Sequence, residues 1–255
     1  MSSASATENI NSSFFDGQYK EVWRSLIPEE LTKRELDFII QYFDLKPGQK
    51  VLDMMCGYGR HAIGLSRKGI HVTAVDNLTA YINDIEKIVR QENLPLQYLQ
   101  SDILSYTANE KFDLAICMGN SLNFFNEGDC LRLMHSVAES LRRGGKFLIN
   151  SWSLAEIVIK NFTEKSWSYE GDHKVLTDSQ YLFNPTRIES DLIMIDNEGR
   201  TEVKKAIDYI FSLSEMERML AISGFSLKEV HSIPGKKKFS LGEPRVYIIA
   251  ENNGG

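Results

Sequence analysis

The chain is poor in the residues that build disulfide frameworks and metal clusters. Its 255 residues include three cysteines, Cys56, Cys117 and Cys130. They stand apart from one another and match no metal-binding spacing, so we expect no bound metal. This usage is typical of a reducing cytoplasm. The first twelve residues are polar and lack the apolar core of a secretory signal peptide, so we expect a cytoplasmic location.

Long apolar runs and an excess of positive charge are also missing. No stretch approaches the ~20 apolar residues that a membrane-spanning helix needs. The net charge is −6, whereas a broad nucleic-acid surface would be basic. The dense cationic run Lys236-Lys237-Lys238 is better explained as a solvated loop. We therefore expect no membrane or nucleic-acid partner, and a length of 255 residues suits one α/β domain with an insertion.

What the sequence does contain is a strand, a glycine turn, a helix and a second strand, beginning near residue 50. The apolar segment 50–54 precedes Gly57 and Gly59, and the next apolar segment ends at Asp76. Glycines let the backbone come close to a ligand, because a Cβ would collide with it. Asp76 lies 23 residues after Asp53 (76−53), which places a carboxylate to bind both hydroxyls of a ribose. The unit predicts a nucleoside site.

The position of Asp53 favours one of two nucleosides that use this plan. A dinucleotide site puts its first glycine at the strand end and presents a helix N-terminus to a pyrophosphate. Here Asp53 ends the strand, and a carboxylate aimed into a phosphate site would repel the ligand. The same carboxylate suits the ammonium group of a methionine moiety. S-adenosylmethionine is therefore favoured, although Gly57-x-Gly59-x-x-Ala62 also matches the dinucleotide pattern.

From about Tyr19 onward, the chain resembles the class I S-adenosylmethionine-dependent methyltransferases. Asp53-x-x-x-Gly57-x-Gly59 resembles their first motif, Asp76-Asn77-Leu78 the ribose motif and Ser101-Asp102-Ile103 the adenine motif. The segments 112–121 and 141–149 resemble the fourth strand with its active-site loop and the turn into the fifth strand. The resemblance implies S-adenosyl-L-methionine as the cofactor. The residues expected to bind it are Asp53, Met54, Cys56, Gly57, Gly59, Asp76, Asn77, Leu78, Asp102, Ile103, Met118 and Gly119.

Alternating elements predict an α/β fold with a parallel sheet. Strands are expected at 50–54, 71–75, 96–100, 112–117 and 145–150, with helices at 59–68, 78–92 and 127–142 between them. Antiparallel strands follow at 174–183, 187–195 and 201–211, and then a helix and two last strands, 225–232 and 245–250. By resemblance, this is a Rossmann-like seven-stranded methyltransferase sheet, mostly parallel with an antiparallel last strand, plus a small antiparallel β insert. Ligands then bind at the carboxyl ends of the strands.

The expected organisation has five parts. Residues 1–13 form a disordered tail, 14–45 an N-terminal helical lid and 46–152 the cofactor-binding core. Residues 153–212 form the insert over the acceptor site, and 213–255 complete the sheet. Two capping boxes are expected to start helices, Thr32-x-x-Glu35 and Ser214-x-x-Glu217. The layout resembles that of the TDP-amino-sugar N,N-dimethyltransferases and, more loosely, of glycine N-methyltransferase.

The predicted function is transfer of a methyl group to an N or O atom of a small-molecule acceptor by in-line displacement. We expect a monomer or a homodimer. The sequence identifies no general base, and His61 is better explained as a packed helix residue. Two alternatives are a nucleotide-dependent oxidoreductase and a non-catalytic S-adenosylmethionine-binding protein. Candidate acceptor residues are Tyr19, Trp23, Asn120, Ser121, Asn123, Phe124, Trp152 and Arg245.

Overall fold

The structure is a computed structural model that describes residues 9–233 and 236–254. It divides into two compact units. The core unit is made of the described residues of Ile27–Phe162 and Ile210–Gly255, and the insert unit joins those of Met1–Leu26 to Thr163–Tyr209. Each unit is described by itself.

The core unit is built on an eight-stranded sheet with the order β11-β10-β12-β5-β4-β1-β2-β3. Strands β3, β2, β1, β4 and β5 pair in parallel, whereas β12 is antiparallel to both β5 and β10. The expected fold class is confirmed, and the two-residue β11 adds an edge strand to the expected seven. The strands are β1 (Lys50–Met54), β2 (His71–Asp76), β3 (Leu96–Gln100), β4 (Phe112–Cys117), β5 (Leu141–Ser151), β10 (Phe225–Ile233), β11 (Lys237–Lys238) and β12 (Val246–Asn252).

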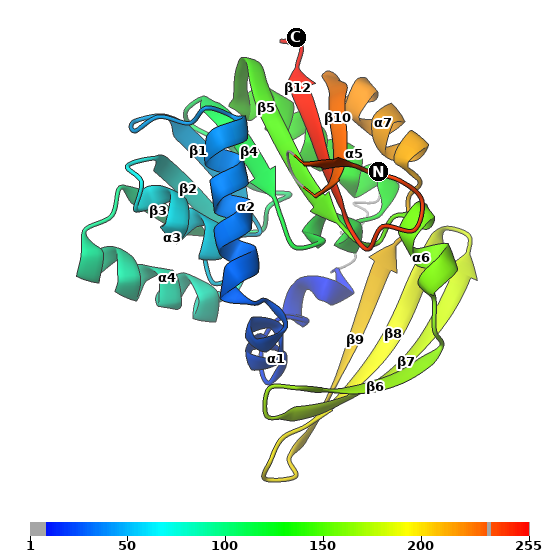
Figure 1. Cartoon of the computed structure of the whole chain (residues 1–255). Coiled ribbons are helices and arrows are strands. Elements are labelled where there is room, and N and C mark those ends of the chain that lie inside the picture. Colours follow the sequence, from blue (N-terminus) through cyan, green and yellow to red (C-terminus); the bar gives the residue numbers. More distant parts are fainter. Residues whose placement is uncertain (1–8, 234–235, 255) are drawn as a thin grey trace, which may run out of the picture. The chain divides into compact units, whose positions relative to one another are not determined.

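Helices cover both faces of this sheet, as right-handed crossovers require. Figure 1 shows α2 in front of the sheet and α5 behind it. On the α2 side, one hydrophobic cluster joins α2, α3 and α4 to the central strands, with Ile39, Leu65 and Ile85 fully buried. The helices are α2 (Glu29–Tyr42), α3 (Arg60–Ser66), α4 (Thr79–Glu92), α5 (Glu127–Ser140), α6 (Ala155–Asn161) and α7 (Leu213–Ile222), with the 3-10 helix η2 (Ser121–Phe124).

Both expected capping boxes are corrected by the structure. Helix α2 begins at Glu29, after an extended Pro28, and therefore runs through the expected cap at Thr32. Proline is favoured at a helix start because its missing N–H would have no partner there. Helix α7 begins two residues earlier than expected, with a capping box formed by Ser212 and Glu215. The sequence offers serine three residues before glutamate twice in succession, and the structure uses the first pair.

The insert unit contains one four-stranded antiparallel sheet with the order β6-β7-β8-β9. Its strands are β6 (Lys165–Glu170), β7 (His173–Phe183), β8 (Thr186–Ile195) and β9 (Thr201–Tyr209). β7, β8 and β9 match the three expected strands, and β6 was not expected. β6 has the sequence Lys-Ser-Trp-Ser-Tyr-Glu, in which polar and aromatic residues alternate over only two repeats, and this short pattern is a weak signal for a strand.

The N-terminal segment belongs to the insert unit. It comprises η1 (Ile10–Ser13) and α1 (Tyr19–Leu26). A small hydrophobic core joins Phe14, Tyr19 and Val22 to Val175 and Met194 of the insert sheet. Residues 10–13 of the expected disordered tail are therefore helical, and residues 1–8 lie outside the described residues. The expected lid 14–45 is divided between two units at residue 26.

Within the described residues, no helix is both long and apolar enough to cross a membrane.

The α7 capping box gives a direct test of the local structure. Ser212→Ala should lower the free energy of unfolding by about 1 kcal/mol, because the backbone N–H of Glu215 loses its acceptor. Ser214→Ala is the matched control: Ser214 is exposed inside the helix, where alanine is the better helix former, so stability should not fall. Urea unfolding of the two variants measures the difference. Equal losses would contradict the assignment of the cap to Ser212.

Candidate functional site

Four parallel strands end at one edge of the core sheet and bring most of the expected cofactor residues together. The register pairs Met54 with both Val75 and Cys117, and it pairs Asp76 with Gln100. The loops after β1, β2, β3 and β4 therefore leave the sheet at nearly the same level. The backbone N–H of Ser101 donates to the carbonyl of Asp76, which joins two of these loops directly.

Asp76 holds the glycine turn after β1. Its Oδ2 accepts a hydrogen bond from the backbone N–H of Gly57 at 2.8 Å, and its Oδ1 accepts one from Leu78 at 3.0 Å. Burial raises the pKa of Asp76, while these backbone N–H groups and that of Asn77 oppose the change. The carboxylate thus both shapes the turn and stands at the ligand edge, next to an exposed Asn77.

The two glycines of the turn have different tasks. Gly57 has a φ of +56°, and a Cβ built there would meet no atom within 4 Å, so the space in front of it is open to a ligand. A Cβ on Gly59 would lie 2.7 Å from the Ile85 side chain in α4. Gly59 therefore allows α4 to pack closely, and its role in cofactor binding stays a prediction.

Met55 completes the turn in the left-handed conformation, with a φ of +52°. The left-handed region costs a residue with a side chain roughly 1–2 kcal/mol. Asn120, in the loop after β4, has a φ of +68°. Strained backbone of this kind concentrates at functional sites, and here it lies at the ends of two adjacent strands.

Asp53 is a buried carboxylate with an unused oxygen. The residue is 1% exposed, and its Oδ2 has no hydrogen-bond partner among the described residues. Burial raises the pKa of Asp53 to about 7, although the charge of Arg60 and the backbone N–H of Ala62 act against the rise. The nearby charge of Asp76 adds to it. Such a group is well suited to a cationic ligand that would pair with the free oxygen.

A buried polar network lies beside Asp53, and no motif in the sequence indicates it. Glu35 of α2 accepts hydrogen bonds from Arg60 (2.5 Å) and His61 (3.0 Å) on one oxygen and from Tyr247 (2.7 Å) on the other. Burial opposes ionisation of Glu35, but the hydrogen bond from His61, the charge of Arg60 and the hydrogen bond from Tyr247 lower its pKa to about 2. Burial and the Arg60 charge lower the pKa of His61 to about 4, so His61 is a neutral donor.

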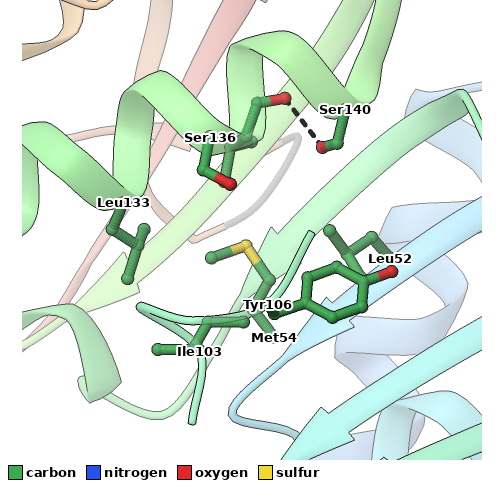
Figure 2. Close-up of a pocket in the computed structure, with 8 residues that line it drawn as sticks. Leu52, Met54, Ile103, Tyr106, Leu133, Ser136 and Ser140 are labelled. Atoms are coloured by element: carbon green, nitrogen blue, oxygen red, sulfur yellow. Dashed lines mark hydrogen bonds between the residues drawn. The ribbon is translucent and has the colours of Figure 1, made fainter. Parts of the chain in front are cut away.

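Two further expected cofactor residues, Met54 and Ile103, meet in a pocket on the α5 side of the sheet. Figure 2 shows their side chains together with those of Leu52, Tyr106 and α5 residues. The loop that joins β3 to β4 covers this pocket in place of a crossover helix, and Asp102 in the same loop is exposed. The α5 residues in the lining are Leu133, Ser136, Val137 and Ser140.

The loop after β4 is fastened to the loop after β5. The Asn120 Oδ1 accepts hydrogen bonds from the backbone N–H groups of Trp152 (2.9 Å) and Ser153 (3.1 Å), and its Nδ2 donates to the Ser153 hydroxyl. The Asn123 amide bonds to the Ser151 hydroxyl and the Ser153 carbonyl. Both asparagines are 1% exposed. Their amides hold two loops together, and their assignment to an acceptor site stays a prediction.

The other residues expected near this loop are less deeply buried. Met118 and Gly119 are buried at the end of β4, and Gly119 donates its N–H to Asn150 at 3.2 Å. Ser121, Phe124 and Trp152 are half-buried. Their assignment to an acceptor site remains a prediction.

Of the remaining expected acceptor residues, Arg245 belongs to the core unit, and Tyr19 and Trp23 belong to the insert unit. Arg245 is half-buried and its side chain interacts with Tyr247, which places it beside the Glu35 network. Tyr19 is buried in the insert unit, with Trp23 packed against the same core. Burial, followed by the charges of Asp208 and Glu170, raises the pKa of Tyr19 far above its ordinary value. Tyr19 is therefore a hydrogen-bond donor and not a phenolate base at neutral pH.

The three cysteines are buried thiols. Burial and the nearby Asp76 and Asp53 carboxylates raise the pKa of Cys56 well above its usual value, and burial raises that of Cys117 to about 12. Neither thiol is activated as a nucleophile. Over the described residues, no group of three or more His, Cys, Asp or Glu side chains could hold a metal ion.

The chain is similar in sequence to known methyltransferases. The family described as "Methyltransferase domain" matches residues 51–145, which run from β1 into β5. The glycine/sarcosine N-methyltransferase of Aphanothece halophytica is 25% identical over 181 residues, covering 69% of this chain and 68% of that enzyme. The ubiquinone biosynthesis O-methyltransferase of Rickettsia akari (strain Hartford) is 33% identical over 69 residues, or 27% of this chain and 28% of that enzyme.

Similarity to a solved structure extends over nearly the whole chain. An amino pentose methyltransferase from Micromonospora echinaspora, solved with S-adenosylmethionine bound, superposes with a TM-score of 0.70 at 17% identity. The superposition covers 93% of this chain and 97% of that one. The similarity is therefore not limited to the core unit and extends into the insert unit.

Asp53 should destabilise the ligand-free protein above neutral pH. Its folded-state pKa of about 7 exceeds the unfolded value, so the folded state binds the extra proton and stability falls as the pH rises from about 4 to 7. Asp53→Asn removes this penalty. It should raise the free energy of unfolding at pH 8 by about 2–4 kcal/mol and by almost nothing near pH 4.

Urea unfolding without ligand at pH 8 and pH 4 checks the effect of Asp53→Asn. Asp172→Asn, at an exposed turn of the insert unit, is the control and should change stability little at either pH. A loss of stability in Asp53→Asn at pH 8 would contradict a strained, buried charge at this position.

Proposed function

Because the chain is a class I S-adenosylmethionine-dependent methyltransferase, we propose that it methylates a small-molecule acceptor, at an amine nitrogen in preference to a hydroxyl oxygen. The observation that carries the cofactor part of the proposal is the unpartnered, buried Oδ2 of Asp53, on the strand that leads into the turn where Gly57 has open space before it. A carboxylate in that position matches the ammonium group of the methionine moiety. The protein is proposed to act in the cytoplasm, as a monomer or a homodimer.

The residues at the sheet edge fit this cofactor. Asp53 would hold its ammonium group, Asp76 the ribose hydroxyls and Asp102 the adenine amino group, with Ile103 against the ring. Gly57 would present its backbone without a steric barrier. When bound, S-adenosylmethionine supplies an electrophilic methyl group and a neutral leaving group.

The leaving group is neutral, and this determines which catalytic tasks remain for the protein. No side chain has to protonate a neutral thioether, so the main contribution of the chain is to hold the acceptor in line with the bond that breaks. Holding two reactants at about 3–3.5 Å can supply several kcal/mol of the barrier. A neutral amine attacks through its lone pair, and we assign no general base.

The extent of the similarities supports nitrogen as the acceptor atom. The matches to ubiquinone biosynthesis O-methyltransferases cover 27% to 34% of this chain, whereas the matches to glycine/sarcosine N-methyltransferases cover 56% and 69% of it. Cofactor-binding segments are shared by enzymes with different acceptors, so the longer matches bear more on the acceptor. Ser121, Phe124 and Trp152 in the core unit, and Tyr19 and Trp23 in the insert unit, are the proposed acceptor residues.

An acceptor screen tests the proposed chemistry. The full-length protein should release S-adenosylhomocysteine when supplied with S-adenosylmethionine and a panel of small primary and secondary amines, including glycine, sarcosine and amino sugars. The matching alcohols, in which a hydroxyl replaces the amine, are the control panel. Turnover with alcohols alone would reverse the preference for nitrogen. Binding of S-adenosylmethionine without turnover on either panel would favour a non-catalytic role.

The division into two units gives a second test. Removing residues 1–26 and replacing residues 163–209 with a short flexible linker should leave S-adenosylmethionine affinity within about threefold of the native value, because every proposed cofactor residue lies in the core unit. Transfer to the native acceptor should be lost. Calorimetric titration and product release measure the two properties. Full turnover by the shortened chain would remove the insert unit from the acceptor site.

A further inference from the structure

Glu35 is an acidic residue in an apolar position. It lies on the same face of α2 as Phe38, Ile39 and Tyr42, and it is 2% exposed. A buried carboxylate is tolerated only when charge and hydrogen bonds compensate its lost hydration. Glu35 receives both from Arg60, His61 and Tyr247, so a single α2 residue is tied to the first turn of α3 and to β12.

Arg60 stands between two buried carboxylates. Its Nη1 bonds Glu35 at 2.5 Å and the Thr32 hydroxyl at 3.1 Å, and its charge also acts on Asp53. The Arg60 side chain is 9% exposed, so water screens these interactions little. If Glu35 did not hold the guanidinium, Asp53 would be a neighbouring carboxylate with a free oxygen to receive it.

We propose that Glu35 is a positioning residue for the cofactor site: by holding the Arg60 guanidinium, it keeps Asp53 free to receive the ammonium group of the cofactor. This inference rests on the role given to Asp53 in the proposed function. Arg60 supplies a nearby positive charge that favours the ionised form of Asp53 without occupying its free oxygen. Glu35 therefore acts through Arg60 and has no contact with the cofactor.

The charged and titratable groups around Asp53 define the expected pH response. Arg60 faces it from α3 and Asp76 from β2, while the thiols of Cys56 and Cys117 are neutral in this range. Arg60 in turn faces Glu35, with His61 and Tyr247 on the same carboxylate. Asp53, with a pKa of about 7, changes its ionisation near neutral pH, so ligands with an ammonium group should bind more weakly as the pH falls through that value.

Two probes isolate this interaction. S-adenosylhomocysteine carries the amino-acid ammonium group, and methylthioadenosine has the same nucleoside without it. Methylthioadenosine lacks the carboxylate as well, so the ratio of their affinities, measured by calorimetric titration from pH 5.5 to 8.5, reports the whole amino-acid end of the ligand. The change of this ratio with pH and in Asp53→Asn reports the ammonium site, because the ligand carboxylate stays ionised over this range. Asp53→Asn should lower the ratio by about tenfold or more at pH 8, since it removes a hydrogen bond to a charged group.

Glu35→Gln tests the proposal itself. The Arg60 guanidinium should then pair with Asp53, which should lower the affinity ratio about tenfold at pH 8 and move the pH midpoint of S-adenosylhomocysteine binding downward. Methylthioadenosine affinity should stay within about twofold. In the double variant Glu35→Gln/Arg60→Gln the competing cation is gone, so the ratio should return toward the native value. The double variant also lacks an unpaired buried charge, which favours its folding.

Controls separate positioning from loss of structure. Asn252→Ala breaks buried hydrogen bonds between β12 and the end of α5, so it should lower stability without changing the affinity ratio. A native ratio in Glu35→Gln, with a reduced ratio in Asp53→Asn, would overturn the role of Glu35 and leave the cofactor assignment intact. A native ratio in Asp53→Asn would overturn the assignment of Asp53. A lower ratio in the double variant than in Glu35→Gln would show that the Arg60 charge supports the ammonium site more than it competes for Asp53, and it would overturn the proposal.

Discussion

The rest of the site depends on a carboxylate buried at the end of a central strand. Asp53 lies between β2 and β4, with 1% of its surface exposed, and one of its oxygens has no partner. Removing such a group from water is unfavourable unless something cationic receives it. The chain supplies part of that compensation from a distance through Arg60, and it leaves the oxygen free. The unpaired carboxylate thus lowers the free energy of unfolding of the ligand-free protein, and a cationic ligand would restore it. The site is preorganised for such a ligand at the expense of stability.

The same reasoning explains why the first turn of α3 is tied so firmly. The loop after β1 contains a left-handed methionine, a glycine with open space before it and a glycine pressed against α4. Asp76 holds it from β2, and the Glu35–Arg60 pair holds it from α2. Charge-assisted hydrogen bonds are stronger and more directional than neutral ones, which suits a turn that must keep one conformation for a ligand.

Local patterns in the sequence predicted the fold, and they predicted which of the proposed cofactor residues stand at the ends of its strands. Asp53, Gly57 and Asp76 are found at strand ends in register, because strand periodicity and glycine spacing are local properties. Thr32 and Glu35 have the spacing of a capping box, but in the structure both side chains accept hydrogen bonds from Arg60. A carboxylate on the apolar face of α2 was the available signal for a buried partner. That signal does not name the partner, because Arg60 and Tyr247 are distant in sequence.

Local sequence patterns do not predict the hydrogen-bond partners of a loop when those partners lie far along the chain. Asn120 and Asn123 follow a strand at the ligand edge, which is where acceptor residues are expected, but both amides bind the β5 loop some thirty residues later.

The N-terminal segment also has partners that lie far along the chain. Helix α1 packs on strands that begin more than a hundred residues after it, so its unit could be found only from tertiary contacts. Because Tyr19 and Val22 share a core with Val175 and Met194, a change in the insert sheet also disturbs α1. The proposed cofactor residues belong to the other unit, which has its own core. A substitution in the small core of the insert unit can therefore disturb α1 and the insert sheet together, while the core behind the proposed cofactor residues stays intact.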